Sequence, residues 1–282
     1  MENRMVIDGK KLASDIISDL KKLSKPNKIL AAILVGSTGS PQAAQSKSFL
    51  RQKELMAKEL GIVFELFQFG DEILEEDLIS EIKKIGADPE IGGLIVQLPL
   101  PPHFNRDTVL AAINPKQDID ALTPESQKFV SPLPVEVVKD ILQTRDYELK
   151  TKVIAVVGRG FLVGKPMADW LRGKCKELII FHSKSDLSKI READLVITAV
   201  GKGGLIKPEM LKPGAGVIDF GYSLCDETCN MKHETDTKKI HGDLDVSSFK
   251  LHDLSFYTPT PGGTGPILVA EIFKNFYKLN SL

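Results

Sequence analysis

The sequence has few of the features that mark secreted, membrane-bound or nucleic-acid-binding proteins. Its 282 residues include three cysteines and one tryptophan, and aromatic residues make up 6%. So few cysteines suit a reducing compartment better than a disulfide framework. A formal net charge of -1 gives no electrostatic reason to expect nucleic acid or an acidic membrane as a partner. Internal repeats and low-complexity segments are also absent from the sequence.

Long apolar runs are missing too. No stretch approaches the length that crosses a bilayer, and the first 11 residues lack the apolar core of a secretion signal. We therefore expect no membrane partner and a cytoplasmic location. With 42% hydrophobic and 27% charged residues, the chain can bury a substantial core and has room for two domains. This composition is typical of a soluble enzyme.

Cys225, Cys229, His233 and His241 are possible metal ligands, but their spacing is not a recognised zinc pattern. The residues between Cys225 and His233 are polar and typical of a loop. We therefore expect a surface hairpin at this place and no metal site.

Apolar runs alternate with amphipathic stretches along the whole chain. This alternation predicts an α/β fold of two domains, each a mostly parallel sheet with flanking helices. The alternation is interrupted near residues 132–134, where a helix is expected to lead into a second, Rossmann-like unit. The predicted strands cover residues 30–35, 63–67, 94–96, 153–157, 178–181, 195–199 and 217–220, and helices are predicted around Lys53 and over residues 74–85, 135–142 and 266–277.

Two polar side chains occupy positions where apolar ones are expected. Gln97 ends the buried strand 92–96 just before a proline turn, and the carboxyl ends of parallel strands are where α/β sheets bind ligands. Lys53 shares the apolar face of its helix with Ser46 and Phe49, where desolvation lowers the pKa of an ammonium and suits it to proton transfer. The residues alone leave two alternatives open: Gln97 bonds only to backbone, or Lys53 extends along its helix to water.

The second unit contains a glycine pattern typical of dinucleotide binding. Gly158, Gly160 and Gly164 come between the strand 153–157 and a helix, although the third glycine is one residue later than usual. A tight strand-to-helix turn without a ligand is the alternative. The next strand ends in residues 182–185, His-Ser-Lys-Ser, where an NAD site commonly has an acid. Because Arg159 offers positive charge instead, NADP is favoured.

Four segments in this order resemble the bifunctional methylenetetrahydrofolate dehydrogenase/cyclohydrolase family. The resemblance spans nearly the whole chain. The family motifs are a Ser-x-x-Tyr-x-x-x-Lys helix ending in Gly-Ile, then Val-Gln-Leu-Pro-Leu-Pro leading to Asp-Val-Asp-Gly, then Gly-Arg-Ser-x-x-Val-Gly-x-Pro, and finally Pro-Val-Pro-Gly-Gly-Val-Gly-Pro. They correspond here to residues 46–62, 96–101 with 118–121, 158–166 and 259–266.

The resemblance implies a homodimeric enzyme of one-carbon metabolism. It oxidises 5,10-methylenetetrahydrofolate with NADP and then hydrolyses the 5,10-methenyl product to 10-formyltetrahydrofolate. The implied folate-binding catalytic domain comprises residues 1–143, with a C-terminal helix over 264–282 packing back on it. Residues 144–263 form the implied NADP-binding domain.

The resemblance also assigns roles to individual residues. The implied catalytic residues are Lys53, Gln97 and Asp120, with Gln97 bonded to Lys53 and Asp120 accepting hydrogen bonds from the pterin edge. The implied substrate-binding residues are Ser46, Phe49, Leu98, Pro261, Gly262 and Gly263, and the implied cofactor-binding residues are Gly158, Arg159, Gly160, Gly164, Ser183 and Tyr222.

Several residues depart from the family pattern. Phe49 stands at the family tyrosine and lacks its hydroxyl, and Gly160 stands where a serine normally follows the arginine. Gln117 replaces a common lysine, Ala121 replaces a common glycine, and the loop 36–45 is longer than the common form. These changes keep three alternatives open: a family member with weak cyclohydrolase activity, another NADP-dependent dehydrogenase, and a folate- or nucleotide-binding regulatory protein.

Overall fold

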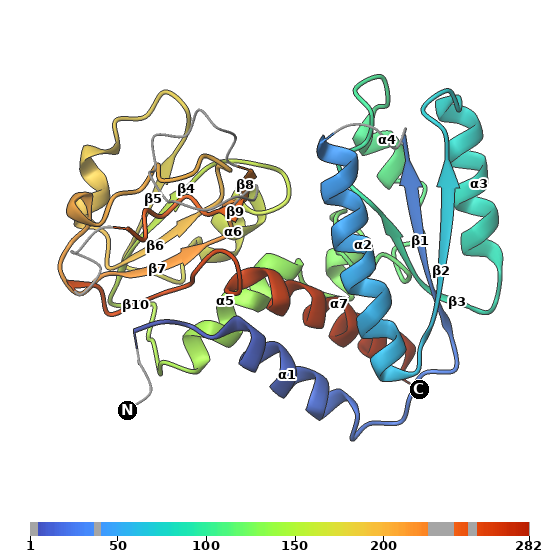
Figure 1. The fold of residues 1–282 in the computed structure, drawn as a ribbon, viewed down its shortest axis with the longest axis horizontal. Coiled ribbons are helices and arrows are strands. Elements are labelled where there is room, and N and C mark those ends of the chain that lie inside the picture. The colour runs from blue at the N-terminus through green and yellow to red at the C-terminus, as the bar shows by residue number, and fades with distance from the viewer. Residues whose placement is uncertain (1–4, 37–40, 225–239, 248–252, 282) are drawn as a thin grey trace. The chain divides into compact units, whose positions relative to one another are not determined.

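The computed structural model describes residues 5–36, 41–224, 240–247 and 253–281 (Figure 1). The chain forms two compact units. The first, called here the N-terminal unit, comprises residues 13–133 and 269–282, and the second, the C-terminal unit, comprises residues 1–12 and 134–268. The expected hairpin with Cys225, Cys229 and His233 lies outside the described residues. In the part of the chain described, no helix is long and apolar enough to cross a membrane.

The N-terminal unit contains three parallel strands in the order β2-β1-β3. Strands β1 and β3 are buried along nearly their whole length, as their apolar runs predict, whereas β2 is partly exposed. The predicted strands and the predicted helix over residues 74–85 are present, with bounds within three residues of those expected. The elements are β1 (Ile29–Val35), α2 (Pro41–Leu60), β2 (Val63–Phe69), α3 (Glu75–Ala87), β3 (Ile91–Val96), α4 (Arg106–Leu110) and the 3₁₀ helix η1 (Ser126–Lys128).

The expected long loop over residues 36–45 is partly helical, because α2 already begins at Pro41. Proline suits this position, since its fixed φ matches a helix and its missing N–H would have no partner in the first turn. A helix that the sequence reading missed, α1 (Gly9–Leu20), buries Ala13, Ile17 and Leu20 at helical spacing.

Two glycines in β3 let the last helix, α7 (Thr264–Asn280), approach the sheet closely. A Cβ atom on Gly93 would lie 2.8 Å from the ring of Phe276. The Nδ2 atom of Asn280 donates to the carbonyl of Gly92 at 3.0 Å, and Nδ2 of Asn275 donates to the carbonyl of Ile119 at 2.9 Å. The C-terminal part of α7 therefore completes the core of the N-terminal unit.

The C-terminal unit contains five parallel strands in the order β10-β7-β6-β4-β5. Its first strand in sequence, β4, lies between β5 and β6, so the chain changes direction across the sheet beside the carboxyl end of β4. Ligands bind at such switch points in open α/β sheets. The elements are α5 (Leu133–Gln143), β4 (Val153–Val157), α6 (Gly164–Leu171), β5 (Glu177–Phe181), β6 (Leu195–Thr198), β7 (Gly216–Asp219), β10 (Phe256–Tyr257) and the antiparallel pair β8 (Ser223–Leu224) and β9 (Ile240–His241).

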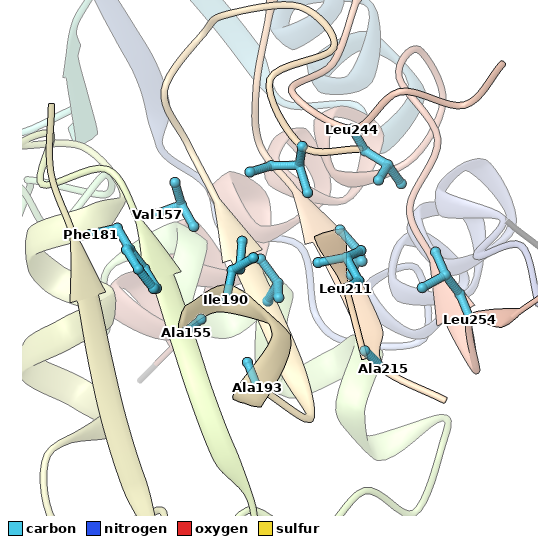
Figure 2. Close-up of a cluster of buried hydrophobic side chains, with 12 residues drawn as sticks. Ala155, Val157, Phe181, Ile190, Ala193, Leu211, Ala215, Leu244 and Leu254 are labelled. Carbon is cyan, nitrogen blue, oxygen red and sulfur yellow. The ribbon is translucent and has the colours of Figure 1, made fainter. Parts of the chain in front are cut away.

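One face of this sheet is covered by short segments instead of the predicted α-helices. The connections after β5 and β6 contain only the 3₁₀ helices η2 (Leu187–Glu192) and η3 (Pro208–Met210). Figure 2 shows Ile190 and Ala193, from and just after η2, beside Ala155, Val157 and Phe181 of the sheet. These short segments still bury the apolar face, so the core forms without the expected helix lengths.

Candidate active site and cofactor site

Helix α2 places Lys53 in the interior of the N-terminal unit. Lys53 is 7% exposed, and Ser46, which lies on the same face, is also buried. Phe49 on this face is half-buried, whereas Lys58 is exposed, as helical periodicity predicts. The side chain of Lys53 therefore does not extend along the helix to water, which was the alternative left open by the sequence.

The carboxyl end of β3 presents Gln97 to this lysine. The Nζ atom of Lys53 donates to Oε1 of Gln97 at 3.1 Å, and both residues are buried. The Nε2 atom of Gln97 donates to the carbonyl of Leu98 at 2.8 Å, which turns the acceptor oxygen of the amide toward Lys53. Gln97 is itself held to the sheet because its N–H donates to the carbonyl of Ile33 at 2.9 Å. The structure thus brings together the predicted pair Lys53 and Gln97.

Asp120 is the third member of this group. Its turn is fixed beside β3, where Leu94 pairs with Asp118 and the buried Asp118 carboxylate accepts the N–H groups of Leu122 and Thr123 at 2.9 and 3.3 Å. Burial lowers the pKa of Lys53, and the negative charge of Asp120 opposes that shift. Burial likewise raises the pKa of Asp120, and the positive charge of Lys53 opposes it.

This electrostatic balance has a chemical consequence. A buried amine whose pKa is lowered gives up or takes a proton closer to neutral pH than an exposed lysine does. Leu98 follows Gln97 and is half-buried. The predicted residues Ser46, Phe49, Lys53, Gln97, Leu98 and Asp120 all belong to the N-terminal unit.

The structure shows the surroundings of two departures from the family pattern. Gln117 donates through Nε2 to the carbonyls of Gly86 and Ile91 at 3.1 and 2.8 Å, so it ties α3 to the start of β3. Ala121 has φ of 53°, a left-handed conformation that favours glycine. Sequence reasoning recognised both substitutions but gave them no structural role, because neither the backbone conformation nor the distant carbonyls can be read from local pattern.

The glycines of the C-terminal unit form a tight turn between β4 and α6. Gly158 has φ of 105°, and a Cβ atom there would lie 2.8 Å from the carbonyl oxygen of Ala199. A Cβ on Gly164 would overlap the carbonyl oxygen of Gly158, whereas nothing lies within 4 Å of a Cβ on Gly160. The turn is thus closely packed beneath and open at Gly160, which fits a pyrophosphate approaching the backbone at the start of α6.

The neighbouring strand β5 ends beside this turn, since Val157 pairs with Phe181 and the N–H of Gly158 donates to the carbonyl of Phe181 at 3.0 Å. Arg159 and Ser183, which follow these strand ends, are both exposed. The first carboxylate after β5, that of Asp186, caps η2 by accepting the N–H of Ser188 at 2.9 Å. Positive charge and a hydroxyl are therefore available here, while this acid is engaged elsewhere.

Tyr222 and the glycine-proline loop also belong to the C-terminal unit. Tyr222 follows β7 and is half-buried. Gly262 has φ of 98° and nothing near its missing Cβ, and its carbonyl accepts the N–H of Gly9 at 3.0 Å. A Cβ on Gly263 would lie 2.8 Å from the side chain of Thr258. Pro261, Gly262 and Gly263 therefore share a unit with the cofactor turn and not with Lys53.

Comparison with known proteins decides the family. The catalytic domain of tetrahydrofolate dehydrogenase/cyclohydrolase matches residues 7–120, and the NAD(P)-binding domain of tetrahydrofolate dehydrogenase/cyclohydrolase matches residues 132–281. The chain belongs to the tetrahydrofolate dehydrogenase/cyclohydrolase family. The predicted family, two-domain α/β fold, dehydrogenase and cyclohydrolase assignment and dinucleotide cofactor are thereby confirmed.

Individual relatives are similar to this chain over nearly its whole length. A bifunctional protein FolD from Staphylococcus aureus (strain Newman) is 31% identical over 96% of this chain and 94% of its own length. The bifunctional enzyme FolD from Campylobacter jejuni has a TM-score of 0.85 and 27% identity, covering 98% of both chains. The FolD enzyme of Trypanosoma brucei, solved with NADP cofactor and an inhibitor, has a TM-score of 0.84 and 26% identity, covering 97% of this chain and 96% of its own.

Proposed function

We propose that this family member oxidises 5,10-methylenetetrahydrofolate by hydride transfer to NADP and then hydrolyses the product. In the first step the methylene carbon loses a hydride and becomes the 5,10-methenyl cation, while NADP becomes NADPH. In the second step water adds to that carbon, one carbon–nitrogen bond opens, and a proton is released to leave 10-formyltetrahydrofolate. Residues 1–143 with 264–282 are assigned to folate binding and catalysis, and residues 144–263 to the cofactor.

The single observation that carries this proposal is the buried contact between Lys53 and Gln97 with the charge of Asp120 acting on it. Lys53 transfers the proton during water addition and ring opening, since its lowered pKa lets it exist in both protonation states. Gln97 orients the amine through its acceptor oxygen. Asp120 accepts hydrogen bonds from the paired N–H donors of the pterin.

The remaining folate contacts are those that the family resemblance implies. Phe49 and Leu98 provide apolar surface for the pterin, and Ser46 offers a hydroxyl one turn before Phe49. Pro261, Gly262 and Gly263 are assigned to the folate by the same resemblance, and the two glycines suit this role because backbone without a side chain lets a ligand approach closely.

The cofactor, when bound, accepts the hydride. Gly158, Gly160 and Gly164 form the turn against its pyrophosphate, and Tyr222 contacts it from the loop after β7. Arg159 and Ser183 bind the 2′-phosphate, a preference for NADP over NAD supported by the engagement of Asp186 in capping η2. Because Gly160 lacks the hydroxyl of the family serine, the phosphate contact depends mainly on Arg159.

Phe49 favours a second candidate function, a dehydrogenase with a slow cyclohydrolase step. A phenylalanine keeps the ring that orients the folate but removes a hydroxyl that could order water. A regulatory protein without catalysis is disfavoured, because it has no use for a buried lysine beside a glutamine and a carboxylate. We further propose that the enzyme is a cytoplasmic homodimer, as the family resemblance implies; light scattering of the purified protein tests the dimer.

One assay distinguishes these candidates. The purified protein is given 5,10-methylenetetrahydrofolate and NADP, and absorbance is followed separately for NADPH and for the methenyl intermediate. Formation of NADPH with little methenyl accumulation supports the bifunctional enzyme, and strong accumulation supports the slow-cyclohydrolase alternative. Absence of NADPH formation with NADP, together with absence of NADH formation with NAD, would refute the proposed dehydrogenase.

A further inference from the structure

A buried carboxylate, that of Asp243, holds the loop that follows β6. It accepts the hydroxyl of Thr198 and the N–H groups of Val200 and Lys202, each at 2.7 Å. Asp243 is completely buried. Because all three donors come from the end of β6 and the residues just after it, this side chain fastens residues 200 and 202 to the end of the strand.

A second buried carboxylate, that of Asp219, lies at the end of the neighbouring strand β7. It accepts the N–H groups of Gly221 and Leu244 at 2.6 and 2.9 Å. The backbone of Asp219 is also bonded on both sides: its N–H donates to Oγ1 of Thr258 at 2.7 Å, and its carbonyl accepts the hydroxyl of Thr264 at 2.9 Å. Asp219 therefore connects β7 to the loop 258–264.

The two acids are neighbours that cost free energy to bury together. Burial and the nearby charge of Asp243 raise the pKa of Asp219 to about 7. In the described part of the chain, no lysine, arginine or histidine forms an ion pair with either carboxylate within 4.0 Å. Burying two acids side by side without a cationic partner costs free energy, and such arrangements are found mainly where they serve a function.

Their position indicates that role. The strands are parallel, so the loops after β4, β6 and β7 emerge at one edge of the sheet. The loop held by Asp243 packs directly against the cofactor turn. A Cβ atom on Gly158 would lie only 2.8 Å from the carbonyl oxygen of Ala199. The same loop meets the β7 loop, because a Cβ on Gly201 would lie 3.3 Å from the carbonyl oxygen of Tyr222.

We propose that Asp243 and Asp219 are positioning residues, which set the loops after β6 and β7 in the geometry that binds the dinucleotide. This inference rests on the proposed function, in which that edge of the sheet binds NADP. Asp243 acts through the main chain of residues 199–202, and Asp219 acts through Gly221 on Tyr222. Neither carboxylate contacts the cofactor itself.

The substitution Asp243→Asn tests the inference. Asparagine keeps one acceptor oxygen, so it can retain Thr198 and Val200, but its amide N–H₂ opposes the N–H of Lys202. Loss of that charged hydrogen bond frees the loop and raises KM for NADP about tenfold. The KM for methylenetetrahydrofolate stays within about twofold, because Lys53, Gln97 and Asp120 lie in the other unit. The loop 258–264, also assigned to the folate, is bonded to Asp219 and not to Asp243.

Asp194→Asn is the matched control. Asp194 also accepts a backbone N–H, that of Val153 at 2.8 Å, and pairs with Lys212. It lies at the amino ends of β4 and β6, whereas the cofactor turn lies at the carboxyl ends. We expect this variant to lower the melting temperature without changing KM for NADP. Calorimetric titration with NADP alone gives the same comparison without turnover.

The outcomes separate this inference from the proposed function. A wild-type enzyme that does not reduce NADP refutes the proposed function itself. An active wild type with a folded Asp243→Asn variant of unchanged KM and Kd for NADP overturns the positioning role. If Asp243→Asn does not fold, Thr198→Val decides, since it removes one donor to Asp243: a raised KM for NADP supports the inference and an unchanged KM overturns it.

Discussion

Replacing Lys53 with methionine tests the assignment on which the proposed chemistry depends. Methionine is similar in length and flexible, so it can fill the space of the lysine stem on the buried face of α2 while removing the amine. The variant loses the hydrogen bond from Nζ to Oε1 of Gln97, which is 3.1 Å long, and the positive charge that acts on Asp120.

The expected effects on stability and activity differ greatly in size. Leaving the buried oxygen of Gln97 without a donor costs about 1–3 kcal/mol, and removing a desolvated ammonium offsets part of that cost. The net change in the free energy of unfolding is therefore within about 2 kcal/mol. Loss of a positioned proton-transfer group lowers cyclohydrolase turnover about 10²- to 10⁴-fold. NADP binding is expected to stay unchanged.

The measurement is the rate at which added methenyltetrahydrofolate disappears, together with thermal unfolding and NADP titration. Lys58→Met is the matched control, because Lys58 lies on the same helix but is exposed. Hydrolysis by Lys53→Met at the rate of the wild type would refute the catalytic role. A loss of activity that accompanies loss of folding would show that Lys53 serves structure instead.

Four further predictions concern other residues. Phe49→Tyr raises the rate of methenyltetrahydrofolate hydrolysis about tenfold more than the rate of hydride transfer, because one hydrogen bond is recovered. Equal effects on the two rates would show that the ring serves packing alone. Arg159→Ala raises Kd for NADP by a factor corresponding to about 1.5–3 kcal/mol and leaves Kd for NAD unchanged. Equal weakening of NADP binding and NAD binding would contradict a 2′-phosphate contact. Ala121→Gly relieves the left-handed φ of 53° and raises the free energy of unfolding by roughly 0.5–1 kcal/mol, measured by urea unfolding; a destabilised variant would contradict this. The pKa of Asp219, about 7 when folded against 3.8 normally, means that the folded state binds more protons between these values. The stability it contributes is therefore full below about pH 4 and is lost as pH rises through about 7, so Asp219→Asn should weaken this pH dependence in urea unfolding, and an unchanged slope would refute it.

The sequence predicted those parts of the site that depend on periodicity and strand ends. Lys53 was placed on an apolar helix face and Gln97 at the carboxyl end of a buried strand, and the two meet in the structure. Helical repeat and strand burial are local properties, so a single sequence carries them. The cofactor glycines were located by their place between a buried strand and a helix, and the role of Asp120 came from the family resemblance, since a carboxylate in a turn has no periodic signal.

Other features depend on contacts between distant residues and escaped the sequence reading. Asp219 and Asp243 received no role, because their partners come from separate loops. The strand β10 has two residues, too few for a period-2 pattern, and it forms through pairing with β7. Helix α1 is different, because Ala13, Ile17 and Leu20 at helical spacing make it predictable from the sequence, although it was not predicted.

The close approach of α7 to the glycines of β3 has a consequence for biosynthesis. Residues 269–282 belong to the N-terminal unit. The sheet that includes Gly92 and Gly93 is therefore completed only by a segment that is translated well over a hundred residues later. Until Phe276 and Asn280 leave the ribosome, the face of β3 that they cover stays exposed, while the C-terminal unit already has nearly all its residues. The N-terminal unit, most of which is translated before residue 134, is thus expected to finish folding last. A nascent chain stalled before residue 269 should present that uncovered strand face to chaperones.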